Sequence, residues 1–142
     1  IAKGVGSYRP SNNRSQVIQK GSNTIILDAY NANPNSMEAA IANLNGLAAS
    51  KKVAVLGDMF EVGADSEIEH QKVAELIASS PVDSVFLVGE NFEKTILNSD
   101  RVKFFPKYAG FAAHFSTLKF ENTTFLIKAS RGMALERVLE LL

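Results

Sequence analysis

A regular alternation of short apolar runs with longer segments of helical periodicity constrains the fold of this chain more than any other feature. The runs at 52–56, 84–88 and 123–128 read KVAVL, SVFLV and TTFLIK, and continuous apolar runs of this length are typical of strands that are covered on both faces. Segment 35–50 places apolar residues at intervals of three, four and seven, as on one face of a helix. Strands joined by helical crossovers predict a mostly parallel sheet with helices on both faces.

About six strands and about five helices are expected from this pattern. The strands are expected at 15–19, 24–27, 52–56, 84–88, 102–105 and 123–128, and the helices at 35–50, 66–80, about 92–96, 109–118 and 133–142. The turn sequence at 20–23 predicts that the first two strands form an antiparallel edge hairpin. Pro34 suits the first turn of the first helix, and Ser66 with Glu69 matches a capping box at the start of the second.

Length and composition exclude several classes of protein. A chain of 142 residues suits one domain with one core. Lys+Arg and Asp+Glu number 15 each and the net charge is zero, so no global field attracts nucleic acid or an anionic membrane. The chain has no cysteine, which excludes disulfides and thiolate chemistry, and no apolar run approaches the roughly 20 residues that a membrane helix needs.

The opening segment differs from the rest of the chain. Residues 1–14 contain Gly, Pro, Ser and Asn with little apolar periodicity, and the first residue is Ile1, not Met. This composition predicts a linker at 1–14 that follows an upstream region. A single domain is then expected over 15–142.

Polar and flexible residues follow most of the expected strands. Ligands of open α/β sheets bind beyond the carboxyl ends of the strands, and the segments at these ends are DAYNANP (28–34), GDMFEVG (57–63), GEN (89–91) and ASRG (129–132). Because parallel strands end at the same edge of a sheet, the sequence predicts a binding site at this edge.

Asp28, Asn31 and Asn33 are candidates in the first of these segments. A carboxylate that ends a strand can accept hydrogen bonds from the hydroxyls of a ribose, or it can cap the turn that follows. Asn31 and Asn33 offer both donors and acceptors, although turn chemistry ahead of Pro34 is the interpretation that their position favours.

The remaining candidates lie in the other loops. Ser130 and Arg131 precede a helix and could form an anion site, or Arg131 could pair with a neighbouring carboxylate. Asp58 and Glu61 could orient an amine or hold Mg²⁺ through water, or Asp58 could act as a cap in a solvated loop. His70 shares a helical face with apolar residues and is expected to be a hydrogen-bonded core residue.

Several catalytic motifs are absent from the sequence. There is no GxxxxGK[ST] phosphate loop and no GxSxG elbow. The segment at 4–9, GVGSYR, lacks the third glycine of GxGxxG and precedes the first strand. The chain therefore offers no known loop for a triphosphate and no complete catalytic set.

Four ordered segments resemble the C-terminal domain of the Mur ligases. DAYNANPNSM at 28–37 resembles the family's DxYNANPxSM block, and Arg14 falls where the family carries an Arg. GDMFEVG at 57–63 and KASRGMALE at 128–136 are similar to the GDMxELG and KGSRxxxxE blocks of the member that adds D-alanyl-D-alanine. Phe60 stands where other members carry a Lys, which argues against the D-glutamate adder, and the Asp-Asn-Pro-Arg pattern of the diaminopimelate adder is absent.

The resemblance implies a Rossmann-like three-layer α/β sandwich that forms the third domain of a cytoplasmic ligase of peptidoglycan synthesis. In this family an N-terminal domain binds the uridine nucleotide precursor, and a central domain makes most of the contacts with ATP and Mg²⁺. The reaction implied is ATP-dependent addition of D-alanyl-D-alanine to UDP-MurNAc-tripeptide through an acyl phosphate. The third domain closes over ATP and is expected to be inactive alone.

The resemblance also implies roles for individual residues. Arg14 would contact the ATP phosphates from the hinge side, and Asp28 would hold the ribose. Asn31 and Asn33 would shape the nucleotide edge. The dipeptide pocket would be faced by Asp58, Ser130 and Arg131.

Two other interpretations remain open on sequence alone. The chain could be a free-standing Rossmann-like module that binds a nucleotide or an amino acid. It could also be the same domain of another Mur ligase or of a folylpolyglutamate-type ligase.

Overall fold

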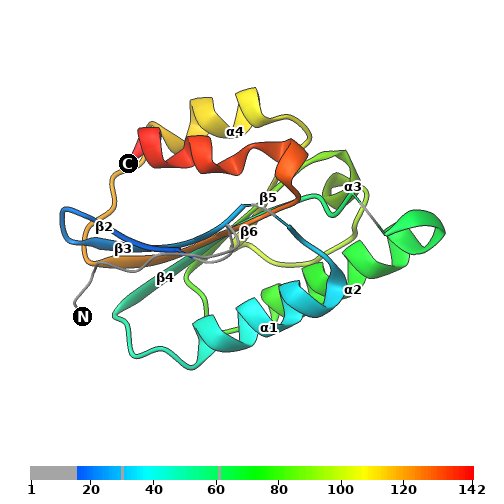
Figure 1. Cartoon of the computed structure of the whole chain (residues 1–142), viewed down its shortest axis with the longest axis horizontal. Coiled ribbons are helices and arrows are strands. Elements are labelled where there is room, and N and C mark those ends of the chain that lie inside the picture. Colours follow the sequence, from blue (N-terminus) through cyan, green and yellow to red (C-terminus); the bar gives the residue numbers. More distant parts are fainter. Residues whose placement is uncertain (1–15, 30, 61) are drawn as a thin grey trace.

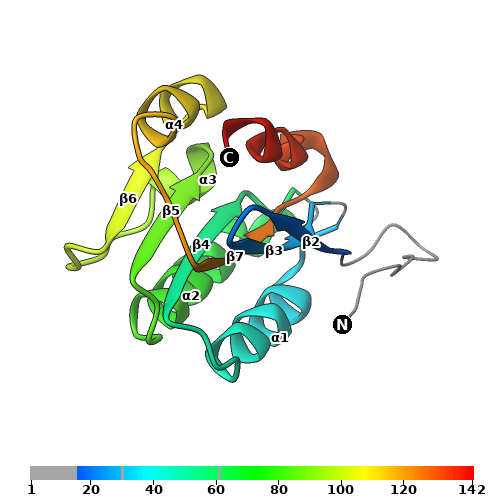
Figure 2. The ribbon, with the colours of Figure 1, turned by 90° about the vertical axis from the view of Figure 1, so that its left-hand side faces the viewer.

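The computed structural model describes residues 16–29, 31–60 and 62–142, and within these ranges it contains one six-stranded sheet. The strands are β2 (Gln16–Lys20), β3 (Asn23–Asp28), β4 (Lys51–Gly57), β5 (Ser84–Val88), β6 (Val102–Phe105) and β7 (Thr123–Lys128). Their order is β2-β3-β7-β4-β5-β6 (Figure 2), and the pair β2–β3 is antiparallel while the other pairs are parallel. The expected sheet with one antiparallel edge hairpin is confirmed.

Helices cover both faces of this sheet. The α-helices are α1 (Pro34–Asn45), α2 (Ser66–Ala78), α3 (Glu90–Glu93) and α4 (Tyr108–Phe115), and the 3₁₀ helices are η1 (Gly63–Asp65), η2 (Arg131–Met133) and η3 (Leu135–Leu141). Figure 1 shows α1 and α2 on one face and α4 with the C-terminal helical segment on the other. The molecule is therefore the three-layer sandwich that the sequence predicts.

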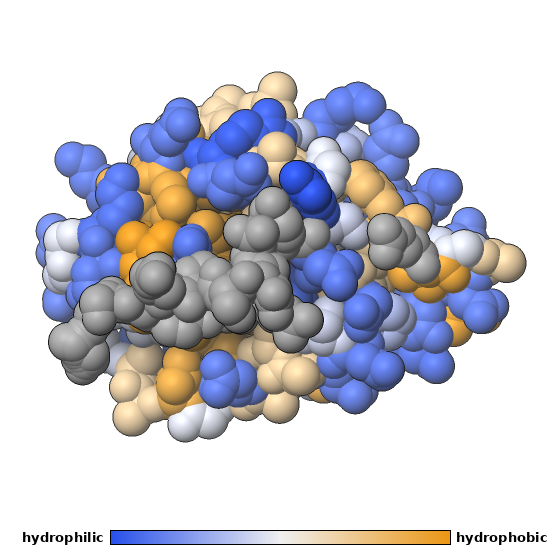
Figure 3. Space-filling model, in the orientation of Figure 1, coloured by the Kyte–Doolittle hydropathy of each residue, from blue (hydrophilic) through white to orange (hydrophobic). Residues whose placement is uncertain are grey.

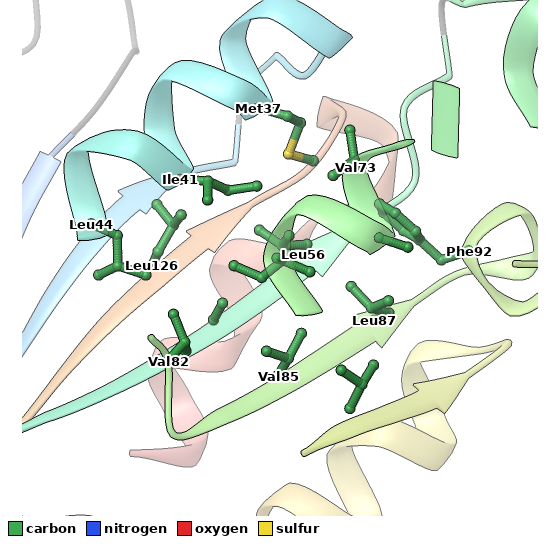
Figure 4. Packing of buried hydrophobic residues seen from close by; sticks show 14 of the residues in the cluster. Met37, Ile41, Leu44, Leu56, Val73, Val82, Val85, Leu87, Phe92 and Leu126 are labelled. Atoms are coloured by element: carbon green, nitrogen blue, oxygen red, sulfur yellow. The ribbon is translucent and has the colours of Figure 1, made fainter. Parts of the chain in front are cut away.

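Each face of the sheet has its own hydrophobic cluster. On the face of α1 and α2, Met37, Ile41 and Leu44 of α1 point at Leu56 and Leu126 of the sheet (Figure 4). The opposite cluster contains aromatic residues of the sheet and of α4 together with residues of η3. Because the central strands are covered on both sides, their residues are apolar without alternation.

The boundaries of the regular strands agree with the sequence prediction more closely than those of the helices. Strands β5, β6 and β7 have the predicted ranges. Helix α1 ends at Asn45 with Gly46 as its C-cap, and α4 ends at Phe115. Both helices are thus shorter than predicted, because the apolar periodicity continues past the residue at which the backbone leaves the helix.

The C-terminal segment is helical, as predicted for 133–142, but it forms two short 3₁₀ helices and not one continuous helix. Ala134 has a left-handed φ of 53° and separates η2 from η3. The two buried residues of η3, Leu135 and Val138, are three positions apart. A 3₁₀ helix aligns residues at this spacing on one side, so both pack into the cluster under α4.

The predicted capping box at Ser66 is wrong. Helix α2 has Asp65 as its N-cap, without a side-chain hydrogen bond. The Oγ of Ser66 instead lies 3.2 Å from Nδ1 of His70. A capping box does occur at the start of α1, where Asn33 and Ser36 exchange hydrogen bonds and Pro34 occupies the first turn, as predicted.

Hydrophilic residues alternate with smaller apolar areas on the face of the molecule that Figure 3 shows. None of the helices in the described part of the chain is long and apolar enough to cross a membrane. The predicted linker at 1–14 lies outside the described residues and stays a prediction.

Candidate functional site

The loops after the parallel strands meet at one edge of the sheet, as the sequence predicts. Three backbone hydrogen bonds join them across the edge. The N–H of Ala129 donates to the carbonyl of Asp28 over 3.3 Å, and the N–H of Ser130 donates to that of Asp58 over 3.1 Å. The N–H of Gly89 donates to the carbonyl of Phe105 over 2.7 Å. Side chains from distant parts of the sequence therefore share one surface.

An ion pair joins the ends of β3 and β7. Lys128 Nζ lies 2.7 Å from Asp28 Oδ2 and also donates to the carbonyl of Asn31 over 3.0 Å. The side chain of Lys128 is 2% exposed and that of Asp28 is 17% exposed. A buried ammonium is costly unless it is paired, so this contact ties the loop after β3 to β7.

Sequence reasoning missed Lys128 as a site residue. A signal was present, because a lysine at the end of an otherwise apolar strand is unusual. Its significance depends on the register, which places Lys128 opposite Asp28 on the neighbouring parallel strand.

The two asparagines after Asp28 lie in different settings. Asn31 is exposed, and its backbone carbonyl accepts from Lys128. The Oδ1 of Asn33 accepts from the N–H of Ser36 over 2.8 Å, and the N–H of Asn33 donates to the Oγ of Ser36 over 3.0 Å. Asn33 therefore caps α1, which is the turn chemistry that its sequence position also suggested.

Asp58 is buried and organises the neighbouring loop. It is 3% exposed, and its carboxylate accepts from the N–H groups of Asn91 and Phe92 over 3.0 and 3.1 Å. These bonds place the carboxylate at the start of α3, where Gly89 approaches it closely. Asp58 thus caps the start of α3. Its expected contact with a dipeptide stays a prediction.

His70 is the hydrogen-bonded core residue that the sequence predicts. It is fully buried, and its ring meets Phe92 edge-on with centroids 4.8 Å apart. Nδ1 donates to the carbonyl of Ser66 over 2.7 Å, and Nε2 accepts from the N–H of Met59 over 2.9 Å. Because a backbone N–H can only donate, this arrangement places the ring proton on Nδ1.

Ser130 and Arg131 lie at the start of η2. The Oγ of Ser130 accepts from the N–H of Phe60 over 2.8 Å, which joins the loop after β4 to the loop after β7. Arg131 is exposed at the same edge. Arg14 and Glu61 lie outside the described residues, so their predicted roles are not placed.

A pocket of about 360 Å³ opens where these loops meet. It is lined by Asp58, Phe60, Gly89, Glu90, Asn91, Lys94, Pro106, Lys107, Tyr108, Gly132, Met133 and Arg137. Three of these residues are basic and two are acidic, so the pocket has an excess of positive charge. Sequence reasoning missed its basic residues, because they come from three separate segments that carry no shared motif.

Charged contacts fix part of the pocket rim. Lys107 Nζ lies 2.6 Å from Glu90 Oε2, and this hydrogen bond and charge lower the pKa of the Glu90 carboxyl and raise that of the Lys107 ammonium. The guanidinium of Arg137 lies 3.8 Å from the ring centroid of Tyr108. Burial raises the pKa of the Tyr108 hydroxyl above its ordinary value of 10.0.

The described residues contain no group of three or more His, Asp or Glu that could hold a metal ion. This edge of the sheet offers hydrogen bonds and positive charge to a ligand.

An α/β sandwich with polar loops beyond the carboxyl ends of its strands is a domain of Rossmann-like fold. The family model described as "Mur ligase, glutamate ligase domain" matches residues 13–131. The chain therefore belongs to the Mur ligase family.

Curated relatives include proteins named UDP-N-acetylmuramoyl-tripeptide–D-alanyl-D-alanine ligase. That of Treponema pallidum is 36% identical over all of this chain and 32% of its own length. That of Bacillus subtilis is 34% identical over 98% of this chain and 32% of its own length. The chain thus spans about a third of the length of the relatives that it matches.

Solved structures of the same ligase have the same fold. MurF from Acinetobacter baumannii superposes with a TM-score of 0.81 at 30% identity, over 94% of this chain and 30% of that protein. MurF from Thermotoga maritima, solved in complex with ADP, has a TM-score of 0.76 at 28% identity, over 95% of this chain and 31% of that protein. The similarity covers nearly the whole chain.

Proposed function

We propose that this chain is the C-terminal domain of a cytoplasmic ligase that adds D-alanyl-D-alanine to UDP-MurNAc-tripeptide in peptidoglycan synthesis. One observation carries the proposal. The family-like segments at 28–37, 57–63 and 128–136 converge on the same sheet edge and are joined there by hydrogen bonds. The names of the relatives supply the reaction and its substrates.

The proposed reaction uses ATP to activate a carboxylate. The terminal carboxylate of the precursor attacks the γ-phosphate, ADP leaves, and an acyl phosphate forms. The amine of the dipeptide then attacks the acyl carbon, phosphate leaves, and the amine loses a proton. An acyl phosphate hydrolyses in water, so a domain that closes over the site protects it.

The end of β3 and the loop that follows it are the proposed contact with ATP. Asp28 would accept hydrogen bonds from the ribose hydroxyls, and Asn31 and Asn33 would shape the surface beside the nucleotide. For Asn33 this effect would act through the position of α1, because its side chain caps that helix. Arg14 would contact the phosphates.

The pocket beside Asp58 is the proposed site of the incoming dipeptide. Its basic rim residues Lys107 and Arg137 suit a terminal carboxylate, because charge-assisted hydrogen bonds are strong. Asp58 and Ser130 would fix the loops that form the pocket wall, and Arg131 would add a further cation at the same edge.

We propose that two further domains complete the enzyme. Since the relatives are about three times as long as this chain, an N-terminal domain for the precursor and a central domain for ATP and Mg²⁺ would precede it. The isolated chain would then be inactive, because the phosphate loop and the metal site of the proposed enzyme would belong to the central domain.

Complementation in trans tests this proposal. The chain is mixed with a fragment containing the two upstream domains, ATP, Mg²⁺, UDP-MurNAc-tripeptide and D-alanyl-D-alanine, and phosphate release is measured. The same assay is run on the covalently joined chain. Release that needs both pieces and the dipeptide supports the proposal. A joined chain that folds but releases no phosphate contradicts it.

Two substitutions sharpen the assay. Asp28→Ala removes the proposed ribose contact and should abolish most of the activity. Asp83→Ala is the matched control, because the carboxylate of Asp83 accepts from the N–H of Lys52 over 2.8 Å at the opposite edge of the sheet. Equal losses in both variants would mean that Asp28 has only a structural role.

A further inference from the structure

Two lysines are buried among the described residues, and they lie at opposite ends of the central parallel strands. Lys52 is near the amino end of β4, 7% exposed, and its Nζ donates to the carbonyl of Asn45 over 3.1 Å. Lys128 ends β7, is 1% exposed, and pairs with a carboxylate. Only Lys128 therefore lies at the edge that carries the candidate site.

The contacts of Lys128 converge on the segment proposed to hold the nucleotide. Its single ammonium binds Asp28 Oδ2 at the end of β3 and the carbonyl of Asn31 three residues further along the chain. An ammonium is a compact charge with three donors. It can therefore fix the rotamer of the carboxylate and the path of the backbone at the same time.

The geometry points to Lys128 as the positioning residue for Asp28 in ATP binding. This inference rests on the proposed contact between Asp28 and the ribose hydroxyls. A carboxylate held in place by a buried partner meets a ligand without losing further side-chain entropy. Lys128 does not touch the nucleotide in this account, and it acts through the carboxylate and the loop that it holds.

The test measures recognition of the ribose hydroxyls in the full ligase chain. KM and kcat are determined with ATP and with 2′,3′-dideoxy-ATP, which lacks the proposed partners of Asp28. Wild-type enzyme should prefer ATP, and Asp28→Asn should lose most of this preference. Lys128→Met should raise KM for ATP by about tenfold to a hundredfold. It should leave KM for the dideoxy nucleotide nearly unchanged, so that the preference collapses as in Asp28→Asn.

Three further variants separate positioning from stability. Lys52→Met removes the other buried lysine and should lower Tm without changing the preference for ATP. Lys128→Arg keeps the charge but spreads it over a larger planar guanidinium whose donors point in fixed directions, so it should fold and show a reduced preference. The double variant Asp28→Asn/Lys128→Met removes both members of the ion pair, so neither charge is left buried without a partner. Its preference for ATP over the dideoxy nucleotide should be no lower than that of either single variant.

The outcomes distinguish the inference from the proposal beneath it. If Asp28→Asn keeps the wild-type preference, the proposed ribose contact is wrong and the inference fails with it. If Asp28→Asn loses the preference while Lys128→Met and Lys128→Arg keep it, the inference alone is overturned. Equal changes in Lys52→Met and Lys128→Met would also overturn it, because the effect would then follow stability alone.

Discussion

Asp58 shows how a single buried residue joins three loops of the candidate site. Its side chain accepts from two N–H groups at the start of α3, and its backbone carbonyl accepts from the N–H of Ser130 after β7. Hydrogen bonds to a carboxylate are stronger than those between neutral groups. The pocket wall therefore depends on Asp58 whether or not the carboxylate also meets a ligand.

Gly89 is the neighbour that makes room for this carboxylate. Its φ is +128°, and a Cβ there would lie 2.3 Å from Cγ of Asp58. We expect Gly89→Ala to lower the free energy of unfolding by about 2–4 kcal/mol, because backbone strain adds to displacement of a buried carboxylate. Gly21→Ala is the control, since Gly21 has a φ of +62° with no atom within 4 Å, and should cost about 1 kcal/mol. Urea denaturation of both variants measures the difference, and equal losses would contradict the account.

The ion pair between Glu90 and Lys107 predicts a measurable change in titration. Lys107→Met should raise the pKa of Glu90 toward its ordinary value of 4.5, because Lys107 supplies the hydrogen bond and most of the charge that lower it. Lys94→Met is the control and should raise this pKa less. Carboxyl ¹³C chemical shifts followed by NMR measure both values. A Glu90 pKa that is unchanged in Lys107→Met would show that the pair does not form in solution.

The sign of the pH dependence follows from the same pair. The pKa of Glu90 is lowered, so its contribution to stability is present above pH 4.5 and is lost as pH falls through the lowered value. The pKa of Lys107 is raised, so its contribution is present below pH 10.5 and is lost as pH rises through the raised value. Both groups are exposed, so the pair should affect the pocket rim more than the stability of the fold.

At the scale of elements, the start of α1 links the site to the helical layer. Asn33→Ala should lower the free energy of unfolding by about 1 kcal/mol, because it removes an N-cap and half of a capping box. Asn33→Asp should retain most of the stability. Asn35→Ala, an exposed position in the first turn, is the control and should change stability by less than about 0.5 kcal/mol. Thermal unfolding checks all three, and no loss in Asn33→Ala would mean that the cap is not formed.

The strands were more predictable than the helix ends for a physical reason. Short continuous apolar runs such as Ser84–Val88 are typical of strands that are covered on both faces, so hydrophobicity goes far to locate them. Helix ends depend on local backbone geometry, which the apolar pattern does not contain. Ala134 illustrates this, because no sequence rule predicts a left-handed alanine that divides the C-terminal segment into two 3₁₀ helices.

At the scale of the whole molecule, the strand order determines which residues meet. β7 is the last strand in sequence but lies between β3 and β4, so Lys128 contacts Asp28 although 100 positions separate them. The sequence indicated the edge that carries the candidate site, because most of the loops after its strands are polar. It did not indicate the ion pair or the basic pocket rim, because these depend on register and strand order.

The molecule presents the proposed nucleotide contact and the dipeptide pocket side by side at one edge. Ser130 connects the loops after β4 and β7, because its Oγ accepts from the N–H of Phe60 and its N–H donates to the carbonyl of Asp58. In the proposed enzyme, one rigid-body closure of this domain would therefore bring both ligands to the precursor's carboxylate. Such closure is a common way for enzymes to assemble a site and exclude water.

The most direct test of the central claim is to identify the product made by the full ligase chain that contains this domain. The enzyme is supplied with UDP-MurNAc-tripeptide, ATP and an equimolar mixture of D-alanyl-D-alanine, D-glutamate and diaminopimelate. The molecular masses of the products are then measured by mass spectrometry. The account predicts that the precursor gains the mass of one D-alanyl-D-alanine residue pair and that ADP and phosphate appear in equal amounts. Addition of one of the competing amino acids, or no amide product from a folded and complete chain, would contradict it.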